Sequence, residues 1–129
     1  EEQDKRNIAM QKICLSCHGS SWVTGHFFRL DNTVQRTNDL THTATNMMME
    51  LWKTGYSEGY GMDQNLFDEP AERWWTSIWL FYANSIRMTS AMGGGGDYGV
   101  FADGRYQLTN TLQKLIKAYE ENSSKKKRK

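Results

Sequence analysis

Two cysteines and a histidine form one short motif in this 129-residue chain. Cys14 and Cys17 are three positions apart, and His18 follows directly. Two thiols at this spacing can each form a thioether to a haem vinyl group, and the adjacent imidazole can then bind the iron. The motif is therefore typical of one covalent c-type haem, attached through Cys14 and Cys17, with His18 as the proximal iron ligand.

Two other uses of paired thiols fit this sequence less well. A dithiol redox pair usually lies in a thioredoxin-like βαβ context, and no strand pattern of any length occurs here. A structural zinc site needs more thiols or a spaced pair of histidines, and the chain has no third cysteine. Because the haem uses both cysteines, we expect no disulfide.

The remaining two histidines are candidates for the distal iron ligand. An electron-transfer haem needs a second axial ligand, whereas a catalytic haem keeps that position open. His42 lies on an expected helix, far enough along the chain to fold back over the same iron. His26 follows His18 by only eight positions, so it could instead ligate a haem on another chain. Each could also be a surface or packing histidine, and the methionines at 47–49 have the spacing of core residues.

The apolar spacing predicts helices and no strands. A short helix is expected from about Ile8 through the haem motif, after a charged terminus that is either loose or a docking segment. A long helix with apolar positions at three- and four-residue steps is expected at 32–54. Pro70 suits the first turn of the next helix, which the four glycines at 93–96 would end. The last helix is expected to begin near Arg105.

Three regions follow from this pattern. We expect a haem c attachment segment at 1–31, a three-helix oligomerisation region at 32–121 and a disordered basic tail at 122–129. The helix that begins at Pro70 is apolar around most of its circumference, which is typical of a helix buried on several sides. Since so short a chain has few other elements to cover it, part of the cover is expected from another chain.

Charge and hydropathy restrict the partners. The net charge is +1, and residues 125–129 supply five of the sixteen basic side chains, so the rest of the chain is mildly acidic. We interpret the tail as solvated and expect no nucleic-acid partner. No apolar run approaches the length of a membrane span. A c-type haem is attached after export, so we expect a mature chain in the periplasm or another exported compartment, its leader having been removed.

Two tyrosines form a second candidate site. Tyr98 stands beside the four glycines, and a residue displayed there could reach out of its own fold. Tyr106 follows shortly after it. The alternative is that these aromatic side chains only cover the apolar stripe of the last helix.

Several segments of the chain resemble the C-terminal part of the octahaem hydroxylamine oxidoreductase family, which includes hydrazine dehydrogenase. The resemblance spans nearly the whole chain, and only the haem motif is specific by itself. The segments that carry it are CLSCH at 14–18, WVTGHFFRL at 22–30, TATNMM at 43–48, GGDY at 95–98 and GRYQL at 104–108.

The resemblance implies a fold and a set of partners. In that family the last of eight haem motifs precedes three long helices that build a trimer. Oxidising members carry a tyrosine in this helical region, bonded covalently to the catalytic haem of the neighbouring subunit. By resemblance, His18 would be the proximal ligand of the last haem, and Tyr98 or Tyr106 the cross-linking residue, with Tyr98 favoured. The other seven haem motifs are absent, so a larger multihaem cytochrome c chain is the expected partner in a trimer-based hetero-oligomer.

The resulting hypothesis is an all-α, single-haem subunit or fragment of a multihaem complex that acts on hydroxylamine, hydrazine or a related nitrogen compound. It would transfer electrons, support the oligomer and lend a tyrosine to a neighbouring site, without being a complete enzyme itself. The main alternative is a free-standing monohaem cytochrome c that carries electrons by diffusion. A third is a haem sensor whose open iron face binds a small gas.

Overall fold

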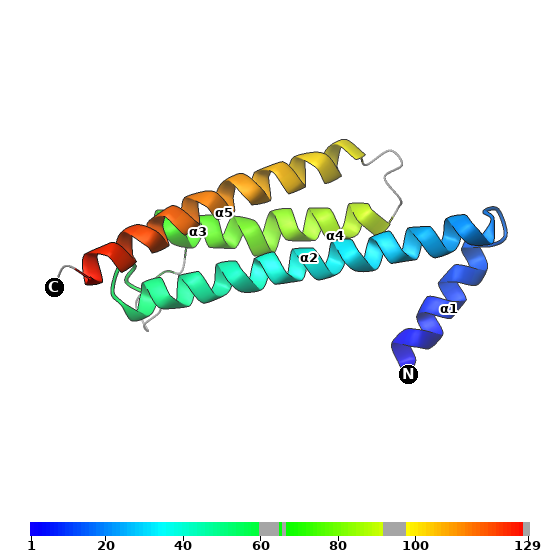
Figure 1. Ribbon diagram of the computed structural model, residues 1–129, viewed down its shortest axis with the longest axis horizontal. Coiled ribbons are helices and arrows are strands. Elements are labelled where there is room, and N and C mark those ends of the chain that lie inside the picture. Colours follow the sequence, from blue (N-terminus) through cyan, green and yellow to red (C-terminus); the bar gives the residue numbers. More distant parts are fainter. Residues whose placement is uncertain (60–64, 66, 92–97, 128–129) are drawn as a thin grey trace.

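The computed structural model describes residues 1–59, 65, 67–91 and 98–127 of the chain. All of the regular structure in these residues is helical, which confirms the all-α prediction. Figure 1 shows α2 (Ser20–Lys53), α4 (Ala83–Ala91) and α5 (Tyr98–Lys126) side by side, with α4 running opposite to the other two. The first helix, α1 (Glu2–Cys14), leaves the start of α2 and points away from this bundle.

The N-terminal residues form a helix where a loose or docking terminus was expected. Helix α1 already begins at Glu2 and ends within the haem motif at Cys14. Acidic residues in its first turn complement the helix dipole, and Glu2 pairs with Arg6 one turn later at 3.2 Å. None of its residues is buried, so α1 gains no packing against the rest of the chain.

Helix α2 begins twelve residues before its expected start, and the predicted boundary between 31 and 32 lies inside it. Gly19 has an extended backbone, and the helix follows at once. Val23 and His26 are buried on the early turns, which gives this part of the helix its own packing. The haem segment and the bundle therefore share one helix. Its C-terminal end was predicted correctly, because Gly55 adopts a φ of 73° directly beyond Thr54.

The apolar central helix begins at Pro70, as predicted, and has three parts. They are α3 (Pro70–Thr76), a π-helical segment η1 (Ser77–Tyr82) and α4. Glu69 and Glu72 form a reciprocal capping box at its start. The buried carboxylate of Glu72 also accepts a hydrogen bond from the Trp52 indole at 2.8 Å, which ties this start to α2.

Helix α5 is longer at both ends than the sequence predicted. It begins at Tyr98, before Arg105, and it continues through the residues expected to form a disordered tail as far as Lys126. Asn122 explains the extension, because its buried amide donates a 2.8 Å hydrogen bond to Thr54 Oγ1. Lysines in the last turn also suit the negative end of the helix dipole. Residues 128 and 129, and the four glycines at 93–96, lie outside the described residues.

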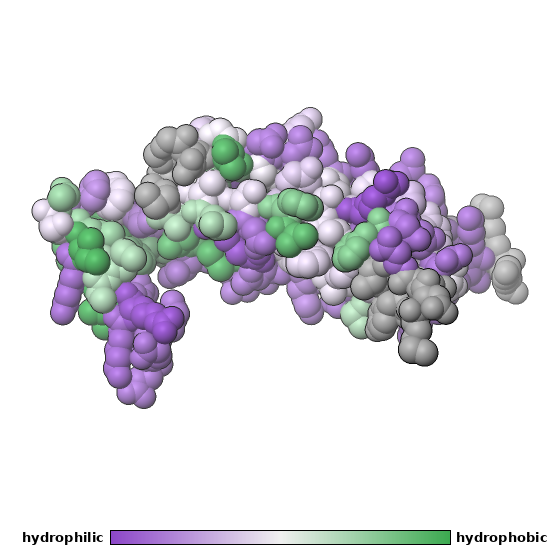
Figure 2. Space-filling model, turned by 180° about the vertical axis from the view of Figure 1, so that it is seen from behind, coloured by the Kyte–Doolittle hydropathy of each residue, from purple (hydrophilic) through white to green (hydrophobic). Residues whose placement is uncertain are grey.

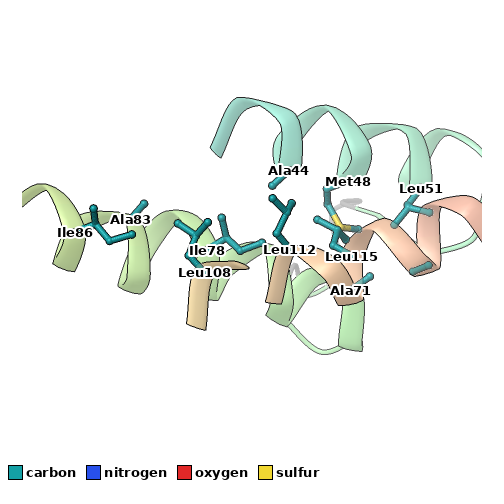
Figure 3. Packing of buried hydrophobic residues seen from close by; sticks show 11 residues of the cluster. Ala44, Met48, Leu51, Ala71, Ile78, Ala83, Ile86, Leu108, Leu112 and Leu115 are labelled. Carbon is teal, nitrogen blue, oxygen red and sulfur yellow. The ribbon is translucent and has the colours of Figure 1, made fainter. Parts of the chain in front are cut away.

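The core of the bundle is a single cluster contributed by every helix except α1. Figure 3 shows these side chains meeting between α2, the central helix and α5. Met48, Ile78 and Leu115 are completely buried. The prediction that the methionine run has core spacing is thus confirmed for Met48. The members of the cluster are Ala44, Met48, Leu51, Ala71, Ile78, Ala83, Ile86, Leu108, Leu112, Leu115 and Ala118.

Much of the apolar central helix is covered by this chain itself. Trp75 packs edge-on against Trp52 at 5.3 Å and donates a 3.1 Å hydrogen bond to Thr45 Oγ1. A partner chain is therefore not needed to cover this side of the helix. Phe81 stays 61% exposed, so part of the circumference remains open.

Gly104 sets how closely α5 approaches α4. A Cβ at this position would lie 3.2 Å from Ile86 Cγ1, whereas a Cβ at Gly99 on the same helix would have no heavy atom within 4 Å. We expect Gly104→Leu to lower the free energy of unfolding by about 1–3 kcal/mol through overpacking. Gly99→Leu should leave it unchanged or raise it by up to about 1 kcal/mol through helix propensity. Denaturant unfolding followed by circular dichroism measures both. Equal effects would contradict the close approach.

Candidate haem-binding site

The haem motif lies on one helical turn at the junction of α1 and α2. The backbone amides of Cys17 and His18 both donate to the Cys14 carbonyl oxygen, at 3.2 and 2.9 Å. The Ser16 hydroxyl donates to the Ile13 carbonyl oxygen at 2.6 Å. The three residues therefore share one hydrogen-bonded backbone turn. Both cysteines are free thiols in this structure.

The surroundings of the motif suit a haem. Cys17 and His18 are exposed, and Cys14 is partly exposed. Apolar side chains that are not buried against the rest of this chain, such as Ile13 and Leu15, are exposed beside them. Figure 2 shows hydrophobic surface gathered where α1 joins α2. Free thiols, an accessible imidazole and uncovered apolar surface are the features that a covalently bound porphyrin needs.

The indole ring of Trp22 lies between the imidazole rings of His18 and His26 and is nearly parallel to both. The indole of Trp22 stacks on His18 at 3.8 Å between centroids and an interplanar angle of 15°. On its other side it stacks on His26 at 5.1 Å and 9°. Trp22 and His26 are four positions apart on one face of α2, and His18 lies two residues before the helix begins. Because the indole separates the two imidazoles, His26 is not placed to bind the iron that His18 would hold. Its ligation of a haem on another chain stays a prediction.

The structure corrects the expectation that His42 folds back over the same iron. Helix α2 is continuous from Ser20 to Lys53, so His42 lies about 33 Å along its axis from the first residue of the helix. His42 is exposed, and within this structure it can serve only as a surface residue or as a ligand to another chain's iron. The long uninterrupted helix, which sequence periodicity underestimated, is the reason.

Both candidate tyrosines are on α5 and point outward. Tyr98 is 64% exposed and Tyr106 66% exposed. They differ in their surroundings, since Tyr98 lines a cavity that His26 also lines, and Tyr106 does not. The structure thus brings together one candidate distal ligand and the favoured tyrosine, from helices whose contact the sequence did not predict.

That cavity has a volume of about 420 Å³ and lies between the first half of α2, the end of α4 and the start of α5. Three arginines line it, Arg29, Arg36 and Arg105, and sequence reasoning did not single out any of them. The available signal was weak. Arg29 and Arg36 are seven positions apart, which places them on one helix face, but only the fold brings Arg105 to them.

Comparisons with known proteins identify one informative likeness. No protein-family model and no curated protein matches the chain. A solved structure described as "Hypothetical multiheme protein" superposes on it with a TM-score of 0.79 and 32% sequence identity. The match covers 97% of this chain and 24% of that one, so the chain spans about a quarter of the length of the structure it resembles. The chain therefore has a multihaem cytochrome-like helical fold.

Proposed function

We propose that this chain is the c-type haem-bearing subunit or segment of a multihaem electron-transfer complex of the hydroxylamine oxidoreductase type. The observation that carries the proposal is the Cys14–His18 turn, with free thiols and an accessible imidazole, on a fold that matches a multihaem protein over nearly its whole length. A haem bound there supplies one-electron redox chemistry, and the protein supplies its position, ligation and dielectric.

Each residue of the site has a distinct part in this proposal. Cys14 and Cys17 would hold the haem through thioethers, and His18 would bind its iron. Trp22 fixes the plane of the His18 ring by stacking on it. His26 is held on the other face of the same indole and is available to an iron of another chain.

The partner is proposed to be a larger multihaem cytochrome c chain in a trimer-based hetero-oligomer located in an exported compartment. The exposed large side chains of the central helix and α5, such as Phe81, Met88 and Tyr106, supply apolar contact surface for it. Tyr98 or Tyr106 would reach a neighbouring catalytic haem. No helix within the described residues has the length and apolar character needed to cross a membrane.

A free-standing monohaem carrier fits the placement of the histidines less well. Such a carrier needs its sixth iron ligand within its own fold. Trp22 separates His26 from His18, and α2 holds His42 far from the motif. Neither candidate is placed to complete the coordination of the iron at His18.

Intact mass spectrometry of the purified, acid-denatured complex tests the proposal. We expect this chain to carry the added mass of one haem, because acid releases non-covalent haem and leaves thioethers intact. A second polypeptide with several haems should accompany it, or this sequence should be part of one long multihaem chain. A haem-free chain would contradict the proposal, whereas a single-haem chain purified without any partner would favour the diffusible carrier.

A further inference from the structure

The cavity beside His26 is lined by basic and neutral side chains. Its described lining includes Arg29, Arg36 and Arg105, together with His26, Ser90 and Tyr98, and no aspartate or glutamate. Its volume of about 420 Å³ is within the range of natural ligand sites. Three guanidinium groups around one hollow repel each other, and that repulsion favours an anionic occupant.

The helices leave these arginines without acidic partners in the described part of the chain. No ion pair involves Arg29, Arg36 or Arg105 there, although exposed pairs such as Arg6 with Glu2 do form elsewhere. Helix α2 carries two aspartates near these arginines in the sequence, Asp31 and Asp39, and neither lines the cavity or forms an ion pair with a described arginine. The Asp39 carboxylate accepts a 2.9 Å hydrogen bond from Gln35. The positive charge of the cavity is therefore not neutralised by these residues.

One of the arginines is held in place by an aromatic ring. The guanidinium carbon of Arg105 lies 5.6 Å from the ring centroid of Phe101, which also lines the cavity. This cation–π contact limits the motion of a side chain that solvent would otherwise leave free. Arginine offers a planar fork of donors that matches a carboxylate in bidentate geometry. The cavity is therefore better suited to carboxylates than to a spherical anion.

The cavity is also close to the haem motif. His26 lines it and is only 7% exposed, and a single indole separates the His26 and His18 rings. A haem carries two propionate carboxylates, which are costly to desolvate unless cations meet them. We propose that Arg29, Arg36 and Arg105 bind the propionate carboxylates of a haem. This inference depends on the proposed function, and the haem is either this chain's own or one of the partner's.

The test removes positive charge from the cavity and measures the midpoint potentials of the haems. Arg36→Gln and Arg105→Gln are made singly and together, with Arg73→Gln on α3 as the control, since Arg73 is exposed and outside the cavity. Spectroelectrochemical titration gives the midpoint potentials in the haem-loaded chain and in its complex. Removing a nearby cation makes reduction less favourable, so the potential of one haem should fall in each single variant and fall further in the double variant.

The two arms identify which haem is bound. If the potential is already lowered in the isolated haem-loaded chain, the carboxylates belong to its own haem. If the change is seen only in the complex, they belong to a partner haem. Arg36→Lys and Arg105→Lys keep the charge and should restore most of the potential. The inference is overturned if the cavity variants match Arg73→Gln in both preparations. If the wild-type chain has no haem by mass spectrometry, the proposed function itself fails, which is a distinct result.

Discussion

Replacing Cys14 and Cys17 together by alanine should abolish covalent haem attachment. The thioethers require both sulfur atoms on one turn, and the Cys14 carbonyl oxygen organises that turn by accepting the amides of Cys17 and His18. With neither thiol present, His18 alone could hold a haem only reversibly. Haem staining after denaturing electrophoresis and intact mass spectrometry should show complete loss. Each single variant should retain a covalent haem through its one remaining thioether, at reduced yield.

The control for this prediction lies within the motif. Ser16→Ala removes a hydroxyl that donates to the Ile13 carbonyl oxygen and leaves both sulfur atoms and the imidazole in place, so it should keep the haem. The double cysteine variant should keep its helical bundle, because α1 contributes no buried residue to the core. Its circular dichroism should therefore be nearly unchanged. Covalent haem that persists without both thiols would refute the assignment of the motif.

Local sequence signals predicted the elements that depend on neighbouring residues. Pro70 predicted the start of the central helix, and the structure adds a capping pair there, Glu69 and Glu72. Gly55 likewise defines the end of α2 through its positive φ. The haem motif belongs to this class, since its whole geometry is contained in one turn.

Tertiary packing decided the features that sequence reasoning missed. Asn122 looked like part of a disordered tail, yet its bond to Thr54, sixty-eight positions away, keeps α5 helical beyond it. The last helix was expected to begin near Arg105, but Gly104 also lies within α5, where the absence of a side chain lets Ile86 approach closely. The cationic cavity depends on the same long-range contact, because Arg105 approaches Arg36 only when α5 packs on α2.

Replacing His26 or His42 by alanine in the assembled complex should have sharply different effects on haem coordination. His26 is buried, stacks on Trp22 and lines the cavity beside Tyr98. Under the proposed function it would bind an iron of another chain. His42 is exposed on the middle of α2. We expect His26→Ala to convert one haem of the partner from six- to five-coordinate, and His42→Ala to change none.

Carbon monoxide measures the difference directly, because it binds a reduced haem whose axial position is open. The reduced His26→Ala complex should bind one more equivalent than the wild type, and His42→Ala should bind the same amount as the wild type. Electron paramagnetic resonance of the oxidised complex should show the matching loss of one low-spin haem. His26→Gln guards against a folding defect, since it fills more of the space and still cannot replace the imidazole as a strong ligand. If both His26 variants keep every haem low-spin, His26 is a packing residue, and its stacking on Trp22 serves only to hold the start of α2 in place.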